Sequence, residues 1–110
     1  MPRFTIGTTP LQVLKANPKR KAFEVQFIPS SIEAGNTGLL FVKRGPGAGT
    51  TTGAGNYDET LNSGSSTSEN TELGSSRLRT ASELWLASDT AGQLVSVAET
   101  LEEDIAPKST

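Results

Sequence analysis

Alternation of apolar and polar side chains predicts strands along much of this chain. Residues 23–27 (FEVQF) alternate with a period of two, which is typical of a strand with one buried face. Residues 16–20 (ANPKR) predict a turn before this strand, because Pro18 fixes its own backbone and restricts Asn17 to extended conformations. Residues 11–14 (LQVL), upstream of the turn, are predicted to form its partner strand.

Further apolar segments also predict strands. Residues 39–42 (LLFV) form a continuous apolar run after a turn at 34–38, which suits a strand covered on both faces. Residues 83–87 (ELWLA) and 93–97 (QLVSV) flank a short connection that contains Gly92. A short Gly-containing connection between two β-prone segments predicts a hairpin, with Gly92 at positive φ.

Residues 45–76 carry few large apolar side chains, and Gly, Ser or Thr occupies 19 of these 32 positions. Burial of so little apolar surface would not offset an ordering entropy of about 1–2 kcal/mol per residue. The segment is therefore predicted to be a long loop that becomes ordered on contact with neighbouring subunits. Residues 101–110 form an acidic tail. Thr100 and Glu103 have the spacing of a capping box, which is compatible with a single helical turn. A frayed tail without helical structure is the alternative.

These elements predict one all-β domain over residues 1–110, an antiparallel β-sandwich or small barrel of about six to eight strands. With 34% hydrophobic residues the core is thin, so we expect additional stability from neighbouring subunits and a homo-oligomer. No apolar stretch approaches the roughly 20 residues that cross a bilayer, and the first residues lack the apolar segment of a signal peptide. We expect a cytoplasmically made product with no membrane partner.

The composition restricts the possible chemistry. The chain has no His and no Cys, which excludes Ser-His-Asp triads, Cys-His pairs, disulfides and the usual zinc sites. Glu102, Glu103 and Asp104 lack the spacing and the Gly of a calcium loop. Residues 45–50 lack the Gly-Lys-Ser/Thr ending of a phosphate-binding loop. We therefore expect a protein that is not an enzyme and that carries no cofactor or metal.

Charge is distributed unevenly along the chain. Residues 1–44 hold seven Lys or Arg against two Glu, whereas residues 45–110 hold ten acidic residues against three basic ones. Either an uneven solvated surface or an oriented contact explains this asymmetry. Nucleic acid is not expected, because the Phe residues occupy inward-facing positions and the net charge is −2. The candidate contact residues are the basic turn Lys19, Arg20 and Lys21 and, on another copy, the acidic Glu102, Glu103 and Asp104.

Two aromatic residues are candidates for a sugar- or receptor-binding surface. Trp85 lies between Leu84 and Leu86 on a predicted strand, so its ring faces away from both, either in core or in solvent. Tyr57 is the aromatic residue of the 45–76 segment. An exposed aromatic platform would indicate a binding module, whereas buried rings would only stabilise the fold.

Two segments resemble parts of a known family. Residues 13–26 (VLKANPKRKAFEVQ) are similar to the strand–turn–strand opening of small β-sandwich virion proteins of bacteriophages, of the capsid-decoration or minor-capsid type. Residues 83–89 (ELWLASD), leading into 94–99 (LVSVAE), are similar to their closing hairpin. The chain departs from these proteins at Phe27 or Ile28, where they often carry Asn, and in its longer middle segment.

The resemblance implies a structural role in a virion and transfers no active-site residues. The implied protein decorates or cements a capsid, and its partners are the major capsid protein or other virion subunits. A receptor- or carbohydrate-binding module on a phage fibre or spike is the alternative.

Overall fold

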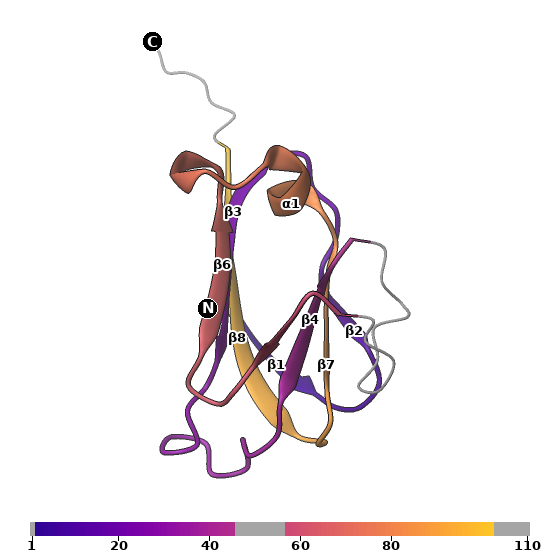
Figure 1. Cartoon of the computed structure of the whole chain (residues 1–110), viewed down its shortest axis with the longest axis vertical. Coiled ribbons are helices and arrows are strands. Elements are labelled where there is room, and N and C mark those ends of the chain that lie inside the picture. Colours follow the sequence, from indigo (N-terminus) through magenta and orange to yellow (C-terminus); the bar gives the residue numbers. More distant parts are fainter. Residues whose placement is uncertain (1, 46–56, 103–110) are drawn as a thin grey trace.

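In the part of the chain that the structure describes, eight strands form two antiparallel sheets that pack face to face (Figure 1). A computed structural model of the chain describes residues 2–45 and 57–102. The strands are β1 (Arg3–Ile6), β2 (Leu11–Leu14), β3 (Arg20–Phe27), β4 (Leu40–Arg44), β5 (Glu59–Leu61), β6 (Ser66–Asn70), β7 (Leu84–Ser88) and β8 (Gln93–Leu101). A 3-10 turn, η1 (Thr71–Leu73), and a short helix, α1 (Arg77–Ala81), connect β6 to β7. Within residues 2–45 and 57–102, no helix has the length and apolar character needed to cross a membrane.

The strand orders are β1-β8-β3-β6 in one sheet and β2-β7-β4-β5 in the other. The pairs β1–β8, β2–β7, β3–β6 and β4–β5 are all antiparallel, so the chain forms one long two-stranded ribbon. This ribbon is folded over so that β3 also pairs with β8 and β4 with β7. The arrangement is a jelly roll. Of the two predicted alternatives, the sandwich is confirmed, because the sheets do not close into a barrel.

Alternating side chains of both sheets meet in the core. Phe23, Val25 and Phe27 of β3 are buried on the inward face, as the period-two pattern predicts. The predicted strand at 39–42 corresponds to β4, and its coverage on both faces is confirmed. Phe41 points outward from the core, yet it is only 5% exposed, because the ring of Tyr57 lies 4.8 Å from it between centroids.

The predicted strand partners were wrong in two places. Residues 11–14 form β2, but β2 pairs with β7 in the opposite sheet from β3. Strands β7 and β8 form where predicted, but they belong to different sheets and do not make a hairpin. Both strands bury apolar side chains, such as Leu86 and Val95, and the core is filled when these faces oppose each other. Gly92 in the connection has φ +76°, as predicted.

The loop predicted over 45–76 needs correction, because β5 and β6 lie within it. Strand β6 pairs with β3 over five consecutive residue pairs. Its inward side chains, Thr67 and Glu69, are polar, so the strand lacks the apolar alternation by which strands are recognised. Residues 46–56 of the predicted loop lie outside the described residues.

The helical turn considered at Thr100 is not formed, because Thr100 and Leu101 belong to β8. Glu102 follows as an exposed residue. The rest of the predicted acidic tail, residues 103–110, lies outside the described residues.

Candidate functional site

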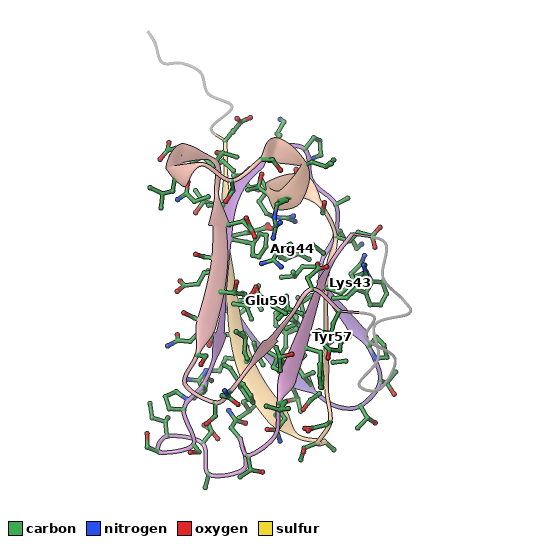
Figure 2. The ribbon with its side chains drawn as sticks, viewed as in Figure 1. Lys43, Arg44, Tyr57 and Glu59 are labelled. Carbon is green, nitrogen blue, oxygen red and sulfur yellow. The ribbon has the colours of Figure 1, made fainter. Side chains whose placement is uncertain are left out.

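A cluster of charged side chains lies between the two sheets, beneath α1. It begins with Arg44, whose side chain shares the inward face of β4 with Leu40 and Val42 and is only 6% exposed. Figure 2 shows Arg44 and Glu59 directed into the space between the sheets, whereas Lys43 lies on the other face of β4. The period of two along β4 therefore brings a guanidinium group to the margin of the core.

The partners of Arg44 come from β5 and β6. Its Nε atom lies 3.0 Å from Glu69 Oε2, and its Nη2 atom donates to Glu59 Oε2 at 3.3 Å. The Thr67 hydroxyl donates to the same Glu59 oxygen at 2.9 Å. On α1, Arg79 donates to Glu69 Oε2 from Nε at 3.2 Å and from Nη2 at 2.9 Å. The cluster therefore links β4, β5, β6 and α1.

Glu69 is the central acceptor of this cluster. Burial by itself raises the pKa of its carboxyl group, but hydrogen bonds from Ser75 and Arg79 and the charges of Arg44 and Arg79 outweigh that effect. The pKa of Glu69 therefore lies below its ordinary value. The carboxylate stays ionised at neutral pH and neutralises an almost fully buried guanidinium.

A cleft of about 410 Å³ opens beside this cluster. It is lined by Arg44, Asp58, Glu59, Leu78, Arg79 and Ser82. The carboxylates of Glu59 and Glu69 both hold arginine, so neither is positioned as a free general acid or base. Among residues 2–45 and 57–102, no three His, Cys, Asp or Glu side chains are grouped to hold a metal ion. The arrangement fits a structural role, and we refer to Arg44, Glu59, Glu69 and Arg79 as the clamp.

Arg20 was predicted to lie on an exposed basic turn, and the structure corrects this. Arg20 is only 1% exposed. Its Nη1 atom donates to the carbonyls of Thr80 (3.1 Å) and Ser82 (3.0 Å) at the end of α1. Its Nη2 atom donates to the Lys15 carbonyl at 2.6 Å, and its Nε atom to Glu99 Oε2 at 3.0 Å. A guanidinium group with this many internal acceptors fixes the end of the helix and cannot reach a partner subunit.

The other predicted contact residues at this end remain at the surface. Lys19 is exposed, and its carbonyl accepts a hydrogen bond from the Glu102 N–H at 2.7 Å. Lys21 is partly exposed and lies 3.5 Å from a Glu72 carboxylate oxygen. The basic turn and the start of the acidic tail are thus neighbours within one chain. Glu103 and Asp104 lie outside the described residues.

The aromatic candidates lie on the outer face of the β2-β7-β4-β5 sheet. Trp85 is half-buried, with Gln12 and Lys43 opposite it on the neighbouring strands. The Trp85 Nε1–H donates to Glu83 Oε1 at 2.8 Å, and the Gln12 amide donates to the same oxygen at 3.0 Å. Tyr57, which Figure 2 shows beside β4, is also half-buried. Tyr57 is therefore distant from the basic turn, at which the other predicted contact residues gather.

The clamp residues were not singled out from the sequence, although a signal for Arg44 was present. Extending the strand pattern of 39–42 by two residues places Arg44 on the same face as Leu40 and Val42. Glu69 had no such signal, because it follows Ser and Thr rather than apolar residues.

Comparison of the chain with protein-family models, with curated protein sequences and with solved structures finds no match. The similarity of two segments to phage virion proteins therefore remains a prediction.

Proposed function

We propose that this protein is a structural virion protein that decorates or cements a bacteriophage capsid through contacts between subunits. The observation that carries the proposal is the eight-stranded jelly-roll topology. Two-sheet jelly rolls form viral capsid domains as well as lectin domains. The support is an analogy at the level of the fold, and it agrees with the resemblance of residues 13–26, 83–89 and 94–99 to such proteins.

The internal use of charge also supports a structural role. Arg20, Arg44 and Glu69 are the most deeply buried charged side chains among the described residues, and all three bind groups within the chain. These contacts fix α1 and both sheets to one another. A rigid module of this kind suits repeated, symmetric attachment to a lattice.

Exposed apolar residues at one end offer a contact surface. Leu73 of η1 is 85% exposed, Leu78 of α1 is 81% exposed, and Leu101 at the end of β8 is 43% exposed. These three elements meet at the upper end of the molecule in Figure 1. We refer to Leu73, Leu78 and Leu101 as the leucine end. Large apolar side chains exposed at one end of a molecule are typical of protein contact surfaces.

The test is binding to capsids assembled from the major capsid protein of the same genome. We expect the protein to co-sediment with these capsids in a fixed ratio, and a Leu73→Ser/Leu78→Ser variant to remain in the supernatant. Ile32→Ser is the matched control, because Ile32 is 67% exposed in the loop that follows β3. A wild-type protein that stays in the supernatant at micromolar capsid concentration contradicts the proposal.

A carbohydrate- or receptor-binding module is the second candidate, and the outer face around Trp85 favours it. A half-buried indole beside the polar side chains of Gln12, Glu83 and Lys43 offers stacking together with hydrogen bonding. This candidate predicts that host-surface glycans shift the Trp85 fluorescence and protect it from acrylamide quenching. Unchanged quenching across host glycans, together with capsid binding, favours the first candidate.

A further inference from the structure

Among the described strands, four have a free edge, namely β1 and β6 in one sheet and β2 and β5 in the other. Natural sheets protect such edges with Pro, with charged side chains directed outward or inward, with bulges or by keeping the strand short. Strand β1 follows Pro2 and carries the exposed Arg3. Strand β2 follows Pro10, and its pairing shifts in register. Strand β5 has only three residues. Three of the four edges are therefore protected.

Along residues 66–70, strand β6 has only one of these devices, the inward charge of Glu69, and arginine already neutralises that charge. Its five residues pair with β3 without a shift in register, and its sequence, STSEN, contains no Pro and no Lys or Arg. Its one charged side chain, Glu69, is turned inward to Arg44 and Arg79 and is only 10% exposed. Ser66 and Ser68 are exposed. The edge is therefore regular in its pairing, carries no outward charge, and presents serine at positions 66 and 68.

The main-chain groups that face outward along β6 can be assigned. The Phe27 N–H donates to the Ser65 carbonyl at 3.0 Å, and hydrogen bonding alternates along an antiparallel pair. Thr67 and Glu69 therefore direct their main-chain groups at β3, whereas Ser66, Ser68 and Asn70 direct theirs away. Asn70 confirms the assignment, because its N–H donates to Ser75 Oγ at 2.9 Å and its carbonyl accepts from the Ser75 N–H at 3.1 Å.

Ser66 and Ser68 are thus left with outward main-chain donors and acceptors. No hydrogen bond to these groups is found within residues 2–45 and 57–102. Unpaired N–H and C=O groups along a regular strand form a template for a further strand. Because Asn70 is already bonded to Ser75, the template is centred on residues 66–68.

We propose that β6 pairs with β6 of a second copy of this chain, antiparallel about a twofold axis at Thr67. In this register Ser66 of each copy lies opposite Ser68 of the other. The pairing is self-complementary, as a twofold interface requires, and it brings no like charges together because Glu69 points inward. The two four-stranded sheets then become continuous. This inference deepens the proposed assembly function by naming a surface for self-association.

Amide hydrogen exchange measured by NMR at increasing protein concentration tests the pairing directly. We expect the amides of Ser66 and Ser68 to become protected as the concentration rises. The control is Thr5, because the Val97 N–H donates to the Pro2 carbonyl at 3.0 Å, which turns the Thr5 main chain away from β8 towards the free edge of β1. The Thr5 amide is expected to exchange rapidly at every concentration. Equal, concentration-independent exchange at Ser66, Ser68 and Thr5 overturns the proposal.

A pair of proline variants provides the second test. Ser68→Pro removes an N–H that β3 does not use, so the fold is retained while pairing between copies is weakened. By sedimentation equilibrium we expect its dimer dissociation constant to rise at least about tenfold. Thr5→Pro removes the corresponding outward N–H from β1 and is expected to leave dimerisation unchanged. Equal effects of the two variants contradict the assignment to β6.

The outcomes separate this inference from the proposed function. A protein that is monomeric at millimolar concentration but binds capsids overturns the β6 pairing and leaves the capsid role. A β6-paired dimer that does not bind capsids overturns the capsid role and leaves the pairing.

Discussion

Arg44 and Glu69 come from opposite sheets, and Arg44 Nε lies 3.0 Å from Glu69 Oε2. The same Glu69 oxygen accepts a hydrogen bond of 2.9 Å from Nη2 of Arg79, which lies on α1. One carboxylate oxygen thus connects β4, β6 and the helix that covers this end of the sandwich. Removing Glu69 leaves the buried Arg44 with only Glu59 and Asp58 as counter-charges, so the contact is expected to contribute to stability.

Replacing Glu69 with Gln tests this expectation. Glu69→Gln keeps the size of the side chain but leaves Arg44 buried without its nearest counter-charge. We expect the free energy of unfolding to fall by about 2–3 kcal/mol, because Glu59 still pairs with Arg44. Glu72→Gln is the control, because Glu72 is 70% exposed and pairs only loosely with Lys21, and it should cost less than about 1 kcal/mol. Urea titrations of both variants make the comparison, and similar losses contradict the clamp.

Acid is expected to weaken the same contact. The pKa of Glu69 is lowered in the folded chain from an ordinary value of 4.5. Its contribution to stability is therefore complete above pH 4.5 and is lost as the pH falls through the lower pKa of the folded state. Urea midpoints measured from pH 7 down to pH 3 should decline at the acid end, and less steeply in Glu69→Gln. If the urea midpoints of the wild type and of Glu69→Gln decline in parallel with pH, the expected role of Glu69 is contradicted.

Position 20 is expected to require Arg, so that even a substitution by Lys destabilises the fold. Arg20→Lys keeps the charge but supplies one ammonium group where the guanidinium reaches the carbonyls of Thr80 and Ser82 as well as Glu99. Carbonyl groups left without donors should lower the free energy of unfolding by on the order of 3 kcal/mol. Lys21→Arg, at the neighbouring and partly exposed position, is expected to be nearly neutral. Thermal unfolding followed by circular dichroism compares the two.

Gly38 is expected to be replaceable only at a cost. A Cβ atom at this position would lie 2.6 Å from Asp89 Oδ1 and 2.6 Å from Thr90 Oγ1, too close for any side chain. Gly38→Ala should therefore destabilise the fold by about 1–3 kcal/mol through displacement of the β7–β8 connection. Gly7→Ala is the control, since no atom lies within 4 Å of its Cβ position. Equal melting temperatures of the two variants contradict the predicted clash.

The sequence revealed strands better than it revealed their partners. Val25 and Leu86 lie in alternating patterns that identify buried faces, and both are fully buried in the structure. The same alternation gave no information on which sheet each strand joins. A hairpin was therefore predicted around Gly92, whereas this connection crosses from one sheet to the other. Strand β6 was missed because Glu69 occupies an inward position, and its compensation by Arg44 depends on tertiary structure.

The candidate contact residues were recovered only in part. Lys19 and Lys21 are at the surface, as expected of a basic turn, but Arg20 between them is buried. Alternation from Phe23 would place Lys21 inward and Arg20 outward, but the pairing of β3 with β8 shifts in register between Arg20 and Ala22 and turns Arg20 inward. The acceptors that hold it belong to residues 15 and 80–99, so no local pattern could have identified it.

The ribbon topology has a consequence for how the chain folds during synthesis. Arg3 of β1 is paired with Ser96 of β8, and Gln12 of β2 with Trp85 of β7. The earliest strands to leave the ribosome must therefore wait for the last ones, while β4 and β5 are free to pair first. Folding is expected to proceed outward from that pair and to be slow, as for other proteins dominated by distant pairings. Until β8 emerges, β1 has no strand partner and β3 can pair only with β6, so unpaired strand edges stay exposed on the nascent polypeptide.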